Sequence, residues 1–164
     1  MSDKAQRVQV VDTTALSNFA HIQRPDLLRL ALKGEGAITA LVKAEILAGE
    51  SLGVVPTVDW KWLRAVKLTL EEERLFQTLA LTLDDGEASS LAVAMIRRTT
   101  LITDDLPARR LAIRANVTLS GTVGILRLLV AEGHLSIVEG DKKLSEMIRH
   151  GYHSPVRSLR EIRS

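Results

Sequence analysis

The sequence predicts an α/β fold in which helices cover both faces of a doubly wound, mainly parallel sheet. Short apolar runs alternate with segments of helical spacing along most of the chain. Hydrophobic residues make up 46% of the chain but aromatic residues only 3%, so the core must consist of aliphatic side chains, as in buried parallel strands. A length of 164 residues suits one domain with a single core.

The predicted strands are short apolar runs that end at polar or turn-forming residues. In chain order, four strands are expected at residues 8–12, 37–40, 99–103 and 117–120, and the run at 135–140 is compatible with a final strand. Because helical segments separate most of these runs, the strands should pair in parallel.

The predicted helices show apolar residues three and four apart and residues typical of helix ends. Pro25 suits a helix start and Gly49 a helix end, while leucines from Leu75 to Leu83 are spaced four apart behind an acidic first turn. In chain order, helices are expected at residues 13–20, 24–32, 41–49, 71–83, 84–98, 106–116 and 121–133. Residues 50–70 show no regular pattern.

The C-terminal tail is predicted as one helix, a break at Gly151 to Pro155, and a short basic helix. We expect residues 1–140 to form the main domain and residues 141–164 a helical extension of the same domain. The net charge is only +2, but the basic excess lies in the last part of the chain. Such an excess permits a phosphate-rich partner, and it equally suits a solvated basic surface.

Composition excludes several classes of protein. The chain has no cysteine, so disulfides and thiolate metal sites are ruled out, and any metal must bind oxygen or imidazole ligands. The first residues form no long apolar segment, and no stretch approaches about 18 uncharged apolar residues, so we expect neither secretion nor membrane insertion. A cytoplasmic protein is the simplest expectation.

Acidic residues follow two of the predicted strands. Asp12 comes after the first strand, and Asp104 and Asp105 come after the strand at 99–103. Two carboxylates about 4 Å apart repel by roughly 4 kcal/mol at an effective dielectric near 20, so such a pair needs a cation nearby. Each aspartate could instead cap the next helix, but the joint pattern at one sheet edge indicates a site.

Two further acids lie where they could converge with these aspartates. Glu45 lies one turn into the helix that follows the second strand, and Glu87 opens an alanine-rich helix. Taken alone, Glu45 suits a solvated helix surface and Glu87 suits the positive end of a helix dipole. Together with the strand-end aspartates they form a candidate acidic cluster.

Five motifs occur in the order and spacing of PIN-domain proteins, which include the VapC-type toxin ribonucleases. The motifs are VVDTTALSNF, ALVKAEILAGE, LDDGEASSLAVA, LITDDLPARRLA and SGTVGIL. They cover about residues 7 to 140 and are most similar to a PIN-like subgroup with a GEA helix start, a DD strand end followed by AR, and a GT.GIL stretch. The resemblance implies a three-layer α/β/α sandwich around a central, mainly parallel sheet.

The resemblance also implies a metal site, because PIN domains gather three or four carboxylates around one or two Mg²⁺ or Mn²⁺ ions. By position, Asp12 matches the first-strand acid, Glu45 the helix acid and Glu87 the third acid, which is more often Asp in the family. A ligand two residues after a strand-end threonine selects Asp105 as the fourth acid, while the DD of the subgroup leaves Asp104 open. Carboxylates suit this role because Mg²⁺ prefers hard oxygen ligands.

Three residues beside these acids are candidates for substrate contact. The hydroxyls of Thr13 and Thr122 lie where strands turn into helices, so they could hold a substrate phosphate or cap those helices. Arg109 could steer RNA or lie on a solvated helix face.

The function that this pattern predicts is a metal-dependent endoribonuclease acting on RNA. The resemblance further implies the toxin of a toxin–antitoxin pair, with an antitoxin protein as partner, and a homodimer. One alternative is a non-catalytic PIN-like scaffold that binds RNA or an antitoxin. Another is a haloacid-dehalogenase-like phosphatase, although that motif needs a second acid where this chain has Thr14.

Overall fold

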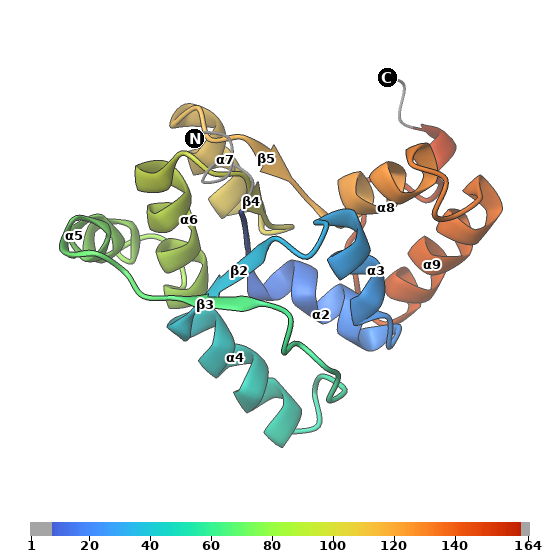
Figure 1. Ribbon diagram of the computed structural model, residues 1–164, viewed down its shortest axis with the longest axis horizontal. Coiled ribbons are helices and arrows are strands. Elements are labelled where there is room, and N and C mark those ends of the chain that lie inside the picture. The colour runs from blue at the N-terminus through green and yellow to red at the C-terminus, as the bar shows by residue number, and fades with distance from the viewer. Residues whose placement is uncertain (1–7, 162–164) are drawn as a thin grey trace.

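The computed structural model describes residues 8–161 and contains a five-stranded sheet whose strands all pair in parallel (Figure 1). The strands, in chain order, are β1 (Gln9–Val11), β2 (Gly36–Thr39), β3 (Arg64–Val66), β4 (Leu101–Ile102) and β5 (Leu119–Ser120). Their order across the sheet is β3-β2-β1-β4-β5. The predicted α/β class with a parallel central sheet is therefore confirmed.

The strand order changes direction between β1 and β4. Successive strands β1, β2 and β3 extend to one side, and β4 and β5 are added on the other. Val10 accordingly pairs with Ala37 of β2 and with Leu101 of β4. Ligands of open parallel sheets bind outside the carboxyl ends of the strands at such a switch point. The residues directly after β1 and β4 are therefore the first place to expect a site.

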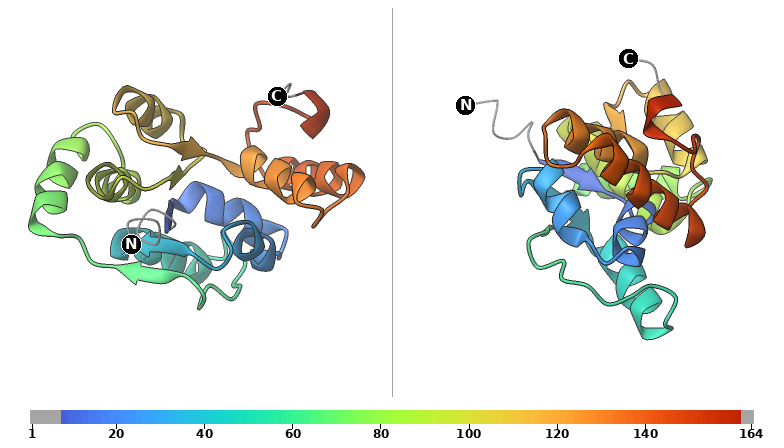
Figure 2. Two further views of the ribbon diagram at one scale, coloured as in Figure 1. Left: turned by 45° about the horizontal axis from the view of Figure 1, so that its top comes forward. Right: turned by 90° about the vertical axis from the view of Figure 1, so that its right-hand side faces the viewer.

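Helices cover both faces of this sheet. In chain order they are α2 (Thr13–His21), α3 (Pro25–Ala31), α4 (Ala40–Ser51), α5 (Leu70–Leu79), α6 (Asp85–Arg97), α7 (Leu106–Arg114), α8 (Thr122–Ala131) and α9 (Ile137–Arg149). The adjacent β4 residues Leu101 and Ile102 point to opposite faces. Ile102 packs in a core cluster with α2, α3, α8 and α9, and Leu101 in a second cluster with α6 and α7. These two groups lie on opposite sides of the sheet in Figures 1 and 2, which confirms the three-layer sandwich.

Three helices begin at polar side chains placed at strand ends. Asp12, Thr39 and Asp105 each accept a hydrogen bond from a backbone amide in the first turn of α2, α4 and α7, respectively. Such caps satisfy amides that have no partner within the helix. The same local chemistry that starts these helices therefore places polar side chains at the carboxyl edge of the sheet.

The structure contains one strand for which the sequence shows no pattern, and it replaces another expected strand by a helix. Residues 50–70, which showed no pattern, contain the edge strand β3, whose Arg64 and Ala65 are both exposed and so produce no alternation. The run at 135–140 is not a strand. Helix α9 begins there instead, because the Ser136 hydroxyl accepts a hydrogen bond from the Glu139 amide and caps the helix.

The C-terminal segment packs into the first core cluster. Leu144 and Met147 of α9 and Leu159 of the short 3-10 helix η1 (Leu159–Glu161) are buried in that cluster with residues of α2, α3 and α8. Gly151, at a φ of 106°, turns the chain back after α9. Within the described part of the chain, no helix has the length and apolar character needed to cross a membrane.

Candidate active site

Asp12 lies at the switch point, directly after β1, and is 1% exposed. Its Oδ1 accepts a hydrogen bond from the Thr13 amide at 2.7 Å, and its Oδ2 accepts one from the Thr103 hydroxyl at 2.8 Å. Thr103 follows β4, so this second bond joins the ends of the two strands on either side of the switch point. Both carboxylate oxygens of Asp12 are thus held in place by the fold.

Ionisation of Asp12 is unfavourable in this buried position. The pKa of Asp12 is raised to about 6, because burial and, to a smaller extent, the negative charges of Glu45 and Asp105 outweigh the hydrogen bonds from Thr103 and Thr13. Glu45 and Asp105 lie near Asp12, because Thr13 is hydrogen-bonded to both Asp12 and Glu45, and Thr103 to both Asp12 and the Asp105 amide. A proton on one of these carboxylates, or a cation bound beside them, would therefore stabilise the site.

Glu45 joins three helices at the site. It projects from the middle of α4, where its Oε1 accepts a hydrogen bond from the Gly86 amide at 3.0 Å and its Oε2 one from the Thr13 hydroxyl. Gly86 belongs to the first turn of α6, and Thr13 opens α2. An ideal Cβ added at Gly86 would lie 2.6 Å from the Glu45 Oε1, far closer than real contacts allow. The Glu45 carboxylate can therefore approach α6 this closely only where residue 86 has no side chain.

Replacing Gly86 by alanine is expected to push the Glu45 carboxylate away from α6. We expect Gly86→Ala to weaken Mn²⁺ binding about tenfold while the helix itself gains intrinsic propensity, since alanine is favoured over glycine by about 1 kcal/mol within helices. Isothermal titration with Mn²⁺ measures the first effect and thermal unfolding the second. Gly49→Ala, within α4, is the control for a general effect of placing alanine in a helix, because the atom nearest to an added Cβ there is a Val55 methyl carbon at 3.2 Å. Unchanged Mn²⁺ affinity in Gly86→Ala would contradict the role of this contact.

Glu87 lies in the first turn of α6, facing the strand-end acids. Burial, followed by the charges of Asp105, Asp12 and Asp84 and a hydrogen bond with Asp105, raises the pKa of Glu87 to about 8. Its Oε2 also accepts a long hydrogen bond of 3.4 Å from the Asp84 amide, which closes a capping box. Glu87 therefore keeps its proton to a higher pH than an ordinary glutamate does.

The raised pKa of Glu87 predicts a pH-dependent stability. The folded state keeps a proton up to about pH 8 that the unfolded chain releases near its ordinary pKa of 4.5, so stability falls as the pH rises through this window. Glu87→Gln stays neutral, so its advantage in melting temperature over the wild type should grow between pH 5 and pH 8.

Thermal unfolding in EDTA at several pH values measures this difference. Glu139→Gln is the matched control, because Glu139 occupies the same third position of α9 as Glu87 does in α6. Parallel curves for Glu87→Gln and the wild type would contradict the predicted titration.

Asp105 completes the acidic group. Its Oδ2 accepts a hydrogen bond from the Ala108 amide at 2.9 Å, and its own amide donates to the Thr103 hydroxyl at 3.1 Å. Its charge raises the pKa of both Asp12 and Glu87, so it lies close to both. Asp12, Glu45, Glu87 and Asp105 thus form one electrostatically connected group, which we call the acidic cluster.

The acidic cluster is not arranged as a ready coordination shell. Across residues 8–161, no three acidic or histidine side chains converge as a metal-binding group in their present positions. Glu45 is engaged with Gly86 and Thr13, and Glu87 with Asp84. To bind one cation together, some of these side chains would have to move from the positions that they now hold.

Asp104 faces a different set of partners from its neighbour. Its carboxylate accepts hydrogen bonds from the Asn18 amide group at 3.1 Å, from the Thr122 backbone amide at 2.8 Å, from the Thr122 hydroxyl, and from the Tyr152 hydroxyl at 3.2 Å. Burial, followed by the nearby Asp104 charge and this hydrogen bond, raises the pKa of Tyr152, so the phenol remains a donor. The two adjacent aspartates therefore belong to different networks.

The three candidates for substrate contact all have partners within the protein. Thr13 donates to Glu45 and Thr122 to Asp104, while the Arg109 guanidinium donates to the Thr103 carbonyl at 2.8 Å. An ideal Cβ at Gly121 would lie 2.6 Å from the Asp104 Oδ1 and 2.9 Å from the Arg109 Nη1. Arg109 is thus the cation beside the aspartate pair, and it lies on the Asp104 side.

Several supporting residues did not stand out in the sequence. Ser89 and Ser90 are fully buried and donate to the Gly86 carbonyl at 3.0 and 2.8 Å, and the Ser89 hydroxyl pairs with that of Thr39 at 2.8 Å. These bonds hold the first turn of α6, and hence Glu87, against the start of α4. The sequence does contain one indication of their role: both serines lie inside an apolar, alanine-rich helix, where a buried hydroxyl needs a hydrogen-bond partner.

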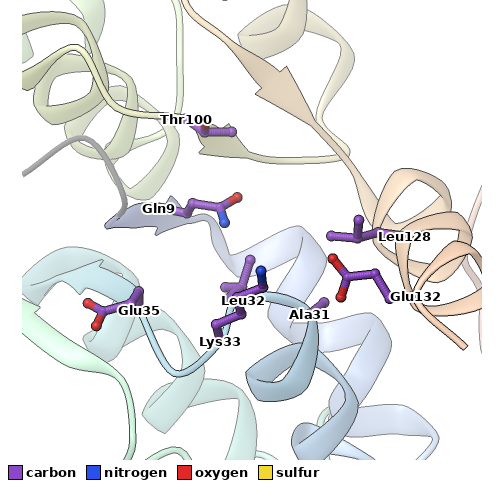
Figure 3. A pocket seen from close by; sticks show the side chains of 8 residues that line it. All are labelled: Gln9, Ala31, Leu32, Lys33, Glu35, Thr100, Leu128 and Glu132. Atoms are coloured by element: carbon purple, nitrogen blue, oxygen red, sulfur yellow. The ribbon is translucent and has the colours of Figure 1, made fainter. Parts of the chain in front are cut away.

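A hollow of about 640 Å³ lies at the opposite edge of the sheet (Figure 3). Gln9 at the start of β1, Thr100 before β4, and Lys33 and Glu35 before β2 contribute to its lining. The acidic cluster follows the other ends of these strands, so this hollow is separate from it.

An all-parallel sheet with aspartates after β1 and β4, and with glutamates of α4 and α6 near them, defines an α/β protein with an acidic cluster at its switch point. The chain belongs to the PIN-domain family, whose model matches residues 8–164. PIN domains are generally nucleases that act on nucleic acid and use divalent metal ions. Comparisons with curated proteins and with solved structures gave no match.

Proposed function

We propose that the protein is a Mg²⁺- or Mn²⁺-dependent endoribonuclease whose active site is the acidic cluster. The observation that carries this proposal is the gathering of four carboxylates near the switch point, where the charges of Glu45 and Asp105 help to raise the pKa of Asp12, and those of Asp105 and Asp12 help to raise the pKa of Glu87. Repulsion among these groups weakens the metal-free site and is relieved by a divalent cation.

The donor chemistry fits Mg²⁺ or Mn²⁺. The four side chains offer only carboxylate oxygens, which these hard cations prefer, and the chain has no cysteine to attract softer metals. Asp12, Glu45, Glu87 and Asp105 would hold the ion. Once bound, a divalent ion lowers the pKa of an attacking water and stabilises charge on the phosphate that is cleaved.

The residues of the chain have separate tasks in this proposal. Thr103 and the Thr13 amide fix both oxygens of Asp12, so the central ligand needs no reorganisation. Glu87 holds a proton in the metal-free protein and must release it when the cation binds. Arg109 of α7 lies beside the pair of aspartates, where its positive charge would attract a phosphate backbone. It also donates a hydrogen bond to the Thr103 carbonyl and so helps to hold Thr103 in place.

The biological setting is proposed from the resemblance to VapC-type toxins. In this setting the protein is a toxin, inhibited by an antitoxin protein, and acts as a homodimer. Exposed apolar side chains at the end of α4 and in the loop after it support a protein interface: Leu47 is 52% exposed, Leu52 78% and Val54 64%.

Cleavage of single-stranded and structured RNA by the purified protein tests the proposed activity. We expect turnover with Mn²⁺ or Mg²⁺, its loss in EDTA, and its recovery when Mn²⁺ is added back. DNA of the same sequence and a small phosphomonoester are the comparison substrates.

The rival functions give different results in the same assays. RNA binding without turnover in any metal would favour the non-catalytic scaffold. Hydrolysis of the phosphomonoester without cleavage of RNA would favour the phosphatase. Metal-independent cleavage would contradict the proposed role of the acidic cluster.

A further inference from the structure

Tyr152 connects the end of the chain to the loop that carries Asp105. The chain turns back at Gly151 after α9, and the Tyr152 amide donates to the Met147 carbonyl at 3.0 Å. The Tyr152 ring is partly buried against the first core cluster, and its hydroxyl donates to the Asp104 Oδ1 at 3.2 Å. A residue some fifty positions away in sequence thus contacts the turn after β4.

The Asp104 carboxylate links Tyr152 to two helices of the fold. Each of its carboxylate oxygens accepts two hydrogen bonds: Oδ1 from the Thr122 amide and Tyr152, and Oδ2 from Asn18 and the Thr122 hydroxyl. Asn18 belongs to α2 and Thr122 begins α8. Tyr152 therefore supplies one of four bonds that tie the turn to α2, α8 and the C-terminal segment.

The turn held by Asp104 also carries the contacts of the acidic cluster. The Asp104 amide donates to the Thr14 hydroxyl at 3.0 Å. On either side of it, the Thr103 hydroxyl donates to Asp12 and the Asp105 amide donates back to Thr103. A shift of the Asp104 carboxylate would therefore move Thr103 and Asp105 relative to Asp12.

We propose that Tyr152 is a positioning residue, which acts through Asp104 to hold Thr103 and Asp105 in the geometry that the acidic cluster needs. On this proposal residues 150–161 complete the active site without contacting substrate. The catalytic consequence rests on the proposed nuclease function, whereas the positioning itself can be measured in the metal-free protein.

Tyr152→Phe removes only the hydroxyl and leaves the ring in the core. In the metal-free protein, we expect the Asp104 and Asp105 amides to exchange with solvent about tenfold faster, because a hydrogen bond to a charged group is lost. Nuclear magnetic resonance with amide hydrogen exchange measures both positions directly. Amides in the middle of α8 serve as internal references and should keep their wild-type rates.

Ser158→Ala is the matched control, because it removes another side-chain hydrogen bond of the same C-terminal segment. The Ser158 hydroxyl donates to Asp141 of α9 at 2.9 Å and makes no contact with the turn. We expect this variant to lower the melting temperature slightly and leave the Asp104 and Asp105 exchange rates unchanged. Equal rates in Tyr152→Phe and the wild type, or equal acceleration in both variants, would overturn the proposal.

Metal binding and catalysis test the consequence. We expect Tyr152→Phe to weaken Mn²⁺ binding and lower kcat, each about tenfold, with the KM for RNA unchanged because the ring does not contact substrate. The double variant with Asp104→Ala should bind Mn²⁺ no more weakly than Asp104→Ala alone, since Asp104→Ala already removes the oxygen that accepts the Tyr152 hydrogen bond. Additive effects would show that Tyr152 does not act through Asp104. If the wild type cleaves no RNA, the proposed function fails, and the amide exchange rates still decide the role of Tyr152.

Discussion

Asp12→Asn is expected to reduce metal-dependent RNA cleavage on the order of 1,000-fold, because several kcal/mol of transition-state stabilisation depend on the bound cation. Asparagine has the shape of aspartate, and its oxygen can still accept the hydrogen bond from the Thr13 amide. The Thr103 hydroxyl can accept from the new amide group in place of donating to a carboxylate. The substitution therefore removes the charge and spares the fold.

Initial rates of RNA cleavage across a Mn²⁺ titration measure this effect, with thermal unfolding in EDTA as the check on folding. The metal-free variant should melt no lower than the wild type, since burial and neighbouring charges raise the pKa of Asp12 and make its ionised form unfavourable. Asp26→Asn makes the same chemical change at an exposed position of α3 and should cleave like the wild type. Equal rates for Asp12→Asn and the wild type would indicate a contaminating nuclease and refute the site.

Glu72→Ala is expected to lower the free energy of unfolding by about 2 kcal/mol, because it removes the charged hydrogen bonds from Arg97, whose side chain is 37% exposed, and the capping bond with Thr69. The Glu72 side chain is 0% exposed and accepts hydrogen bonds at 3.0 Å from the Arg97 Nε and Nη2 and from the Thr69 amide. Thr69 and Glu72 form the capping box that begins α5, and Arg97 lies at the end of α6. Glu72 therefore caps the start of α5 and also connects α5 to α6.

Urea unfolding followed by circular dichroism measures the loss. The exposed pair of Arg24 and Asp26 is the comparison, because Asp26→Ala breaks an ion pair of the same 3.0 Å length and should cost less than about 1 kcal/mol. Burial alone would raise the pKa of Glu72, but the hydrogen bonds from Arg97 and Thr69 outweigh it and lower that pKa. The ionised Glu72 therefore stabilises the folded protein above its ordinary pKa of 4.5. This stabilisation is lost as the pH falls through the lower pKa that Glu72 has in the folded state. A loss as small as that of Asp26→Ala would show that burial adds nothing to this pair.

The fold was largely predictable because its elements carry local signals. Strand ends at Asp12 and Asp105 coincide with helix caps, and the amphipathic helices repeat their apolar residues at helical spacing. β3 was not predictable in the same way, since its pairing with β2 is specified by backbone contacts and not by a pattern of buried side chains. α9 was misjudged at its start because an apolar run of five or six residues suits a strand as well as a buried helical turn.

The candidate acids could be found from the sequence because each belongs to a motif, but their environments could not. Burial and the approach of like charges raise the pKa of Asp12 and Glu87, and neither is visible in a linear chain. The same holds for Gly86, whose missing side chain makes room for Glu45 from a different helix. The supporting hydroxyls of Ser89 and Ser90 likewise acquire their role only when α6 packs beside α4.

By itself the sequence determined the fold class, the PIN-domain family and the set of five acids from which a site can be built. Only the tertiary structure showed that the carboxylates of Asp104 and Asp105 have different neighbours. Adjacent residues in extended backbone point in opposite directions, so one aspartate meets Asp12 and Glu87 while the other meets Asn18, Thr122 and Tyr152. Those partners lie between 18 and 86 positions away along the chain, and packing alone decides which carboxylate they surround.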